Sequence, residues 1–212
     1  MTSPLEIQPD NLETILMAES PDTNYSTQLI IRISTTGNKW RGIGKFDFSA
    51  LPDGVTITAA TLNLYYYAKY GNDAKTRTYW IYELTQTAWV EAQATWNSYT
   101  TGSAWAAAGG DYNIETNKSS LAVPASFGWM SWDVSALIQH CRSVHSKIAH
   151  FLIKDETEGG TQYGCDFHGK RYETDTTLCP KLIITYADCP TVSIRRIKTI
   201  ADRNNRLKRK EI

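Results

Sequence analysis

Short stretches of alternating apolar and polar residues run through most of the chain. In residues 46–48 two phenylalanines flank an aspartate, and in residues 62–67 Leu62, Leu64 and Tyr66 alternate with less apolar side chains. This period of two is typical of a β-strand with one buried face, and it places Tyr65 and Tyr67 on the outward face. The sequence Leu-Pro-Asp-Gly at 51–54 predicts a tight turn between the two stretches, because proline presets φ and glycine admits the left-handed conformation.

Similar patterns predict further strands at residues 12–17, 29–34, 40–48, 76–84, 128–134, 148–154, 163–168 and 181–186. Residues 135–141 are the best helix candidate, because Leu137, Ile138 and Cys141 recur at helical spacing after Asp133 or Ser135 as a cap. Many short strands and one short helix predict an all-β fold, a two-sheet antiparallel β-sandwich (jelly roll).

The chain is predicted to have three parts: an extended N-terminal lead-in at 1–11, a jelly-roll domain at 12–187 and a basic tail at 188–212. The formal net charge is zero, but residues 195–212 carry +6 and the remainder −6. The tail is either a solvated terminus or a short helix that docks on an acidic neighbouring subunit. Its assembly candidates are Arg195, Arg196, Lys198 and Arg206. Nucleic-acid binding is not expected, because the tail lacks interleaved aromatic residues.

Targeting and redox signals are few. No apolar run reaches the length of a membrane span, so no membrane partner is expected. The N-terminus has neither the basic nor the apolar region of a classical signal peptide. The four cysteines lack the spacing of metal fingers and are interpreted as small hydrophobic residues, although Cys179 and Cys189 could pair in an oxidising compartment.

A series of short motifs is ordered along the chain. It includes Pro-Asp-Thr-Asn-Tyr at 21–25, Phe-Asp-Phe-Ser-Ala-Leu-Pro-Asp-Gly at 46–54, Trp-Val-Glu at 89–91, Thr-Trp-Asn at 95–97, Gly-Gly-Asp-Tyr at 109–112, Trp-Asp-Val-Ser-Ala-Leu at 132–137 and Pro-Lys-Leu at 180–182. In this order the motifs resemble the DNRLRE (disaggregatase-related) domain over residues 12–187. Two positions depart from the family pattern, since Glu13 stands where aspartate is frequent and Lys45 where arginine is usual.

The resemblance implies a non-catalytic β-jelly-roll module grouped with carbohydrate-binding modules. Some relatives bind acidic polysaccharides, and they occur in secreted enzymes, surface proteins and phage structural proteins. An aromatic ring outside the core offers its face to the C–H surface of a sugar, and the chain has 12 Tyr and 7 Trp. The predicted ligand-binding residues are Tyr65, Tyr67, Tyr99, Trp105 and Tyr112, with Lys69, Arg77 and Arg171 for an acidic sugar. Taken singly, each of these aromatic side chains is more often an incidental surface residue, and a lysine on a strand more often protects a sheet edge.

The densest motif combines tryptophans with polar residues: Trp89, Glu91, Thr95, Trp96 and Asn97. It is interpreted as a loop that packs under a sheet edge, in preference to a sugar-stacking platform. Trp129 and Trp132 are three residues apart in a predicted strand, so they face opposite sides of the sheet and one of them is expected in the core.

Metal and catalytic motifs are weak. Several aspartates could supply oxygens to a structural calcium, but none lies in a recognisable calcium loop: Asp22, Asp53, Asp73, Asp111 and Asp155. A transition-metal site would draw on His140, Cys141, His145, His150, Cys165 and His168, and is not expected because their spacing converges only if the helix continues. No nucleophile elbow, HExxH or phosphate loop is present, so the chain is predicted to be no enzyme and to need no cofactor.

These observations predict a non-enzymatic jelly-roll adhesion or carbohydrate-binding protein, displayed on a phage particle or an extracellular surface. Its partners would be a polysaccharide or cell-surface glycan and, through the tail, other virion or surface subunits; a homo-oligomer is also compatible. Two alternatives stay open: a purely structural virion decoration protein, and a binding module of a secreted polysaccharide-degrading system.

Overall fold

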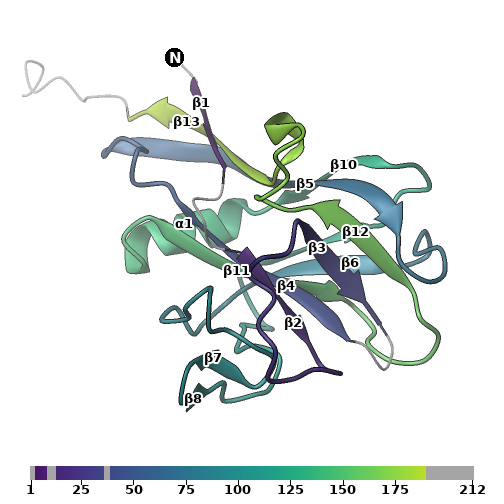
Figure 1. Cartoon of the computed structure of the whole chain (residues 1–212). Helices are drawn as coiled ribbons and strands as arrows, with labels where there is room; N and C mark the ends of the chain where they lie inside the picture. The colour runs from purple at the N-terminus through teal and green to yellow at the C-terminus, as the bar shows by residue number, and fades with distance from the viewer. Residues whose placement is uncertain (1–2, 9–12, 36–38, 190–212) are drawn as a thin grey trace, which may run out of the picture.

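In the computed structural model, which describes residues 3–8, 13–35 and 39–189, eleven strands form one curled antiparallel sheet against which a helix packs (Figure 1). The strands of this sheet are β1 (Ser3–Ile7), β2 (Glu13–Met17), β3 (Ile30–Ser34), β4 (Trp40–Asp47), β5 (Val55–Lys69), β6 (Thr78–Glu83), β9 (Lys118–Ala122), β10 (Gly128–Asp133), β11 (Ile148–Asp155), β12 (Gly164–His168) and β13 (Lys181–Asp188). The other elements are the hairpin β7 (Ser98–Thr100) and β8 (Ser103–Ala104), the helix α1 (Ser135–Val144) and the 3-10 turn η1 (Thr176–Leu178).

Strand β5 is the longest strand of the sheet and pairs with three other strands. β13 and then β12 follow one of its edges, and β10 pairs along the other. Its alternating sequence buries Leu62, Leu64 and Tyr66, which are 2%, 0% and 1% exposed. The predicted core face of this strand is therefore confirmed.

Strand β12 joins the two halves of the sheet, because it pairs with β5 on one side and with β3 on the other. The strands around β5 and those around β4 consequently belong to one sheet that curls about the core. The predicted all-β antiparallel fold with one short helix is confirmed. Its division into the two separate sheets of a jelly roll stays a prediction.

The main hydrophobic core fills the inside of the curl. Phe46, Phe48 and Trp132 are at most 1% exposed there, and the Trp132 indole N–H donates to a backbone carbonyl at 3.1 Å. The close approach of Phe151 to β4 requires a glycine, since a Cβ added at Gly44 would lie 2.6 Å from the Phe151 Cζ atom. A core packed this closely leaves little room for a change in side-chain volume.

Helix α1 closes the core beside β5 and β11 with Leu137, Ile138 and Cys141. The N-cap position is occupied by Val134, which offers no side-chain cap, so the prediction that Asp133 or Ser135 caps the helix is wrong. The Asp133 carboxylate instead accepts a hydrogen bond from the Ser135 N–H at 2.9 Å, in a turn that leads into the helix. In the described part of the chain, no helix is long and apolar enough to cross a membrane.

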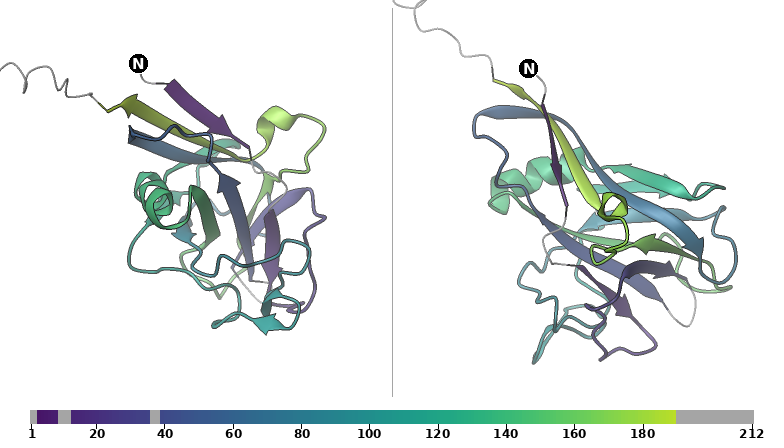
Figure 2. Two further views of the ribbon diagram at one scale, coloured as in Figure 1. Left: turned by 90° about the vertical axis from the view of Figure 1, so that its left-hand side faces the viewer. Right: turned by 45° about the horizontal axis from the view of Figure 1, so that its top comes forward.

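The first and the last strand along the chain are neighbours in the sheet. β1 pairs with β13, so the predicted lead-in contributes a strand to the sheet. These two strands lie side by side at one end of the molecule, and the β7–β8 hairpin lies at the other end (Figure 2). The predicted tail beyond residue 189 lies outside the described residues.

A second cluster of buried side chains covers the opposite face of β4 and β11. Its members are Leu16, Ile43, Leu84, Trp89, Ala94, Trp105 and Leu152. The loop between β6 and β9 supplies both tryptophans, and the Trp105 indole N–H donates to the Thr95 carbonyl oxygen at 2.8 Å. The structural interpretation of the motif at 89–97 is confirmed, because its aromatic residues pack over the sheet.

Candidate functional site

Ring-bearing side chains gather on the outward face of β5, β10 and β12 and of the loop that follows β12. We call this set the aromatic face: Tyr65, Tyr67, Trp129, His168 and Tyr172. Tyr65 and Tyr67 point outward because they alternate with the core residues of β5. Trp129 is directly opposite Tyr65 in the β10–β5 register, which places both rings on the same side of the sheet.

His168 lies between two tyrosine rings. Its ring centroid is 4.2 Å from that of Tyr67 and 3.7 Å from that of Tyr172, with interplanar angles of 7° and 19°. Burial lowers the pKa of His168, because removing the ring from water disfavours its charged form, and nearby Asp175 only partly opposes this. The stack therefore favours a neutral imidazole that holds both tyrosines in place.

Trp129 is the most accessible ring of the aromatic face, with 38% of its surface exposed. It meets Tyr65 edge to face at a centroid distance of 5.3 Å, and the Lys181 Nζ lies 4.5 Å from its ring centroid. Trp132, its counterpart across the strand, is 1% exposed. The prediction that one of the two tryptophans lies in the core is confirmed.

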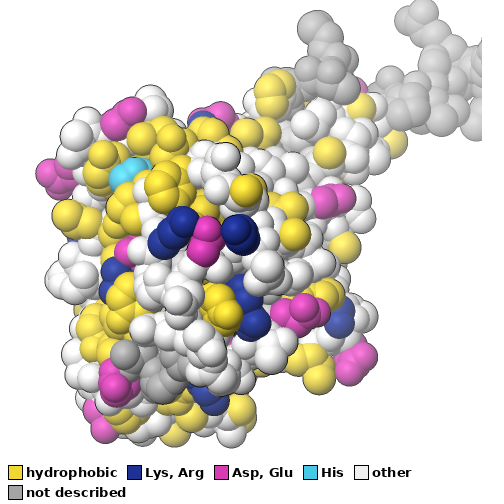
Figure 3. All heavy atoms as spheres, turned by 90° about the vertical axis from the view of Figure 1, so that its right-hand side faces the viewer, with side chains coloured by type: hydrophobic (Ala, Val, Ile, Leu, Met, Phe, Trp, Pro, Cys, Tyr) yellow, Lys and Arg dark blue, Asp and Glu magenta, His cyan; other side chains and the backbone are white. Residues whose placement is uncertain are grey.

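The basic residues predicted to bind an acidic sugar each have an acidic partner within the protein. The pairs are Lys69 with Asp73, Arg77 with Asp155, and Arg171 with Glu91. Lys69 lies two residues beyond Tyr67 on β5 and so shares its outward face, whereas Arg77 follows the next loop. Figure 3 likewise shows Lys and Arg side chains flanking an acidic one on one side of the molecule. The positive charges of Lys69, Arg77 and Arg171 are therefore already balanced by acidic side chains before any ligand binds.

The three predicted loop rings lie in the second cluster or at its rim. Trp105 is only 5% exposed, so the prediction that its ring stands outside the core is wrong. The loop folds back over the sheet and uses this large apolar ring as its anchor. Tyr99 packs on Trp105 at a centroid distance of 5.8 Å, and Tyr112 packs on Tyr82 at 4.8 Å.

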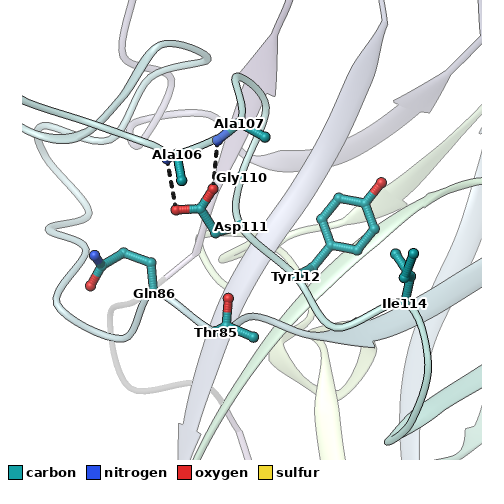
Figure 4. A pocket seen from close by; sticks show the side chains of 8 residues that line it. All are labelled: Thr85, Gln86, Ala106, Ala107, Gly110, Asp111, Tyr112 and Ile114. Atoms are coloured by element: carbon teal, nitrogen blue, oxygen red, sulfur yellow. Dashed lines mark hydrogen bonds between the residues drawn. The ribbon is translucent and has the colours of Figure 1, made fainter.

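Tyr112 also lines an open pocket of about 500 Å³ (Figure 4). The other lining residues are Thr85, Gln86, Ala106, Ala107, Gly110, Asp111 and Ile114. The Asp111 carboxylate accepts hydrogen bonds from the N–H groups of Ala106 and Ala107 at 3.0 and 2.8 Å, which closes the loop at this point. Asp111 is thus used to shape the pocket wall.

A second set of rings lies on and beside the outward face of β6. This β6 strip consists of Trp80 and Tyr82 on the strand, neither of which was predicted to bind ligand, and of the predicted Tyr112, which packs on Tyr82. The centroids of Trp80 and Tyr82 are 5.8 Å apart at an interplanar angle of 18°, and the Lys118 Nζ lies 5.2 Å from the Trp80 ring. The alternation in the predicted strand at 76–84 was the signal that could have revealed it.

The five aspartates considered for calcium are dispersed over separate loops. Each has a partner in the protein: Asp22 with Asn97, Asp53 with Lys147, Asp73 with Lys69, Asp111 with two backbone N–H groups, and Asp155 with Arg77. They do not share a cluster of metal-ligand atoms among the described residues. A structural calcium stays a prediction. The four assembly candidates of the tail lie outside the described residues.

An antiparallel β domain with aromatic rings on its outward faces defines a class of binding modules that hold ligands on a preformed surface. The model of carbohydrate-binding module family 96 matches residues 10–186, and the chain belongs to this family. The prediction of a carbohydrate-binding module is therefore confirmed, while the DNRLRE assignment stays a prediction. Such families are binding rather than catalytic modules, in agreement with the expectation that the chain is no enzyme. Among curated proteins, none matches the chain.

Proposed function

We propose that the chain binds a polysaccharide or a cell-surface glycan on the aromatic face. The observation that carries the proposal is the exposed Trp129 ring beside Tyr65 on the neighbouring strand. A sugar ring can pack its C–H face on the indole, while tyrosine hydroxyls exchange hydrogen bonds with the sugar hydroxyls. Membership of the family supports carbohydrate binding in general, and the position of the binding surface is the part we propose.

The arrangement of the rings favours an oligosaccharide over a single sugar. Trp129 and Tyr65 come from adjacent strands, and the buried His168 on β12 carries Tyr67 and Tyr172 beside them, so at about 4.8 Å per strand the face extends over about 10 Å. The stack of His168 between Tyr67 and Tyr172 restricts the rotamers of both tyrosines before binding. A surface that is already ordered loses less conformational entropy on binding.

Stacking, rather than charge, is the proposed source of affinity. The Arg32 guanidinium, at the margin of this face, donates two hydrogen bonds of 2.6 Å to the Asp166 carboxylate. Lys69 is also paired with an aspartate. An acidic sugar would have to replace these internal partners. We therefore expect binding to a neutral glycan to change little between 0.1 and about 1 M salt, where exposed charge pairs are screened.

The test is a glycan array with neutral and acidic polysaccharides, followed by calorimetry on the best ligand. Trp129→Ala should weaken binding by at least about tenfold, since a central aromatic contact is worth 1.4 kcal/mol or more. Trp80→Ala is the matched control, because it removes an equal ring from the β6 strip. If Trp80→Ala alone abolishes binding, the β6 strip is the site; if no glycan is retained on the array, the proposed function is refuted.

Display on a phage particle, with the tail docking on a neighbouring subunit, is a further proposal that rests on sequence. It is supported by the +6 charge of residues 195–212 against the −6 of the remainder. Neighbouring genes for capsid or tail proteins would favour it, and neighbouring polysaccharide lyases or hydrolases would favour a secreted module instead. A pure decoration protein would assemble into particles and bind no glycan.

A further inference from the structure

Three side chains outside the aromatic face converge at the place where α1 ends beside β6. Glu83 is the last residue of β6, His140 lies on α1 and His145 immediately follows the helix. The same Glu83 oxygen, Oε1, lies 2.8 Å from His140 Nδ1 and 3.2 Å from His145 Nε2. The three ligand atoms lie within 4.8 Å of one another, and no other group of this kind occurs in the described residues.

Glu83 is a buried carboxylate that forms no ion pair with an arginine or lysine within the described residues. Asp155, Asp166 and Glu158 each pair with an arginine. The Glu83 side chain is 3% exposed, and its polar partners in the described residues are the two histidines and the Asn117 amide, which donates to Oε2 at 2.7 Å. A buried carboxylate needs a compensating positive charge, and this one has no permanently charged partner.

The backbone around the cluster is unusual. Asn117, Ser146 and Lys147 are the non-glycine residues with positive φ in the described part of the chain, at 54°, 50° and 63°. Asn117 holds Glu83, and Ser146 directly follows His145. Left-handed backbone at non-glycine residues is unfavourable and tends to occur where a site requires a particular geometry.

We propose that Glu83, His140 and His145 bind a divalent transition-metal ion, of which Zn²⁺ is the probe. Imidazole nitrogen and carboxylate oxygen suit zinc at 2.0–2.2 Å, and in a tetrahedron such atoms stand about 3.3 Å apart. To reach this separation, the His140 contact to Oε1 needs to open by about half an ångström and the His145 contact by about a tenth, with each imidazole binding through the nitrogen that faces Glu83. The side chains of His140 and His145 are 41% and 27% exposed, so an ion can enter from solvent and keep a water as its fourth ligand.

The bound ion would join α1 to β6 and neutralise Glu83. Asn117 acts as a positioning residue, because it fixes the carboxylate through the oxygen that faces away from the histidines. Outer-shell partners of this kind typically contribute 10–100-fold to metal affinity.

The experiment is calorimetric titration of the EDTA-treated full chain with ZnCl₂, together with thermal unfolding. We expect one ion per chain and a rise of the unfolding temperature by roughly 5–10 °C at 100 times the dissociation constant. His140→Gln with His145→Gln keeps amide donors near Glu83 and should abolish the one-to-one binding. Asn117→Gly preserves the positive φ and should weaken it about 10–100-fold.

Glu115→Gln, an exposed carboxylate in the same loop as Asn117, is the control that should leave zinc affinity unchanged. Circular dichroism of each variant verifies that it is folded. Absence of stoichiometric zinc binding to the parent chain would overturn the proposal. So would equal binding by the folded double histidine variant, because the ion would then sit elsewhere on the surface.

Discussion

Replacing Glu13 with glutamine is expected to stabilise the protein at alkaline pH and to have little effect at acid pH. Glu13 lies on β2 and is 5% exposed. Burial raises the pKa of its carboxyl from 4.5 to about 7. Two effects of Lys170 partly oppose this rise: its backbone N–H donates to Oε1 at 2.6 Å, and its positive charge lies nearby. The folded protein thus takes up a proton at Glu13 that the unfolded chain has already lost.

The sign follows from proton linkage. Between pH 4.5 and 7 the folded state binds more protons at Glu13 than the unfolded state, so the free energy of unfolding falls as the pH rises and stays low above pH 7. From pH 5 to pH 8 this group should account for a loss of about 2.5 kcal/mol. A glutamine does not titrate, yet its amide oxygen can still accept from the Lys170 N–H.

The assay is urea unfolding of the parent and Glu13→Gln at pH 5, 6, 7 and 8. The stability difference between them should grow in favour of the variant by about 2.5 kcal/mol across this series. Glu115→Gln, on an exposed loop, serves as the control and should show no such trend. Parallel stability curves for the parent and Glu13→Gln would refute the reasoning, since Glu13 would then be ionised in the folded state.

Three further predictions concern the core. Burial lowers the pKa of His150 from 6.5 to about 4, so lowering the pH from 7 to 5 should cost about 2 kcal/mol, measured by urea unfolding, and His150→Gln should remove this loss. Gly44→Ala places a Cβ 2.6 Å from a buried phenylalanine and should lower stability by about 1–3 kcal/mol; unchanged thermal unfolding would contradict this. Asp155→Asn weakens a buried pair with Arg77 and should cost about 1.5–3 kcal/mol in the same measurement, whereas Asp53→Asn, in an exposed pair, should cost almost nothing.

The sequence by itself determined those features that depend on short-range periodicity. The alternation around Leu64 and Tyr66 predicted the inward face of β5, and the three-residue spacing of Trp129 and Trp132 predicted opposite sides of β10. Both succeed because a strand turns successive side chains to opposite faces whatever the neighbouring strands are. The helix was recognisable for a similar reason, from the helical spacing of Leu137, Ile138 and Cys141, whereas the residue that caps it was not predicted correctly.

Only the tertiary structure decided which side chains meet across long stretches of sequence. It placed His168 between Tyr67 and Tyr172, and it buried Trp105 in a loop where exposure was expected. It also brought Glu83 into contact with His140 on α1, although the two residues are 57 positions apart in the sequence. Such contacts depend on strand order and register, and these are set by the packing of the whole curled sheet, which no local pattern encodes.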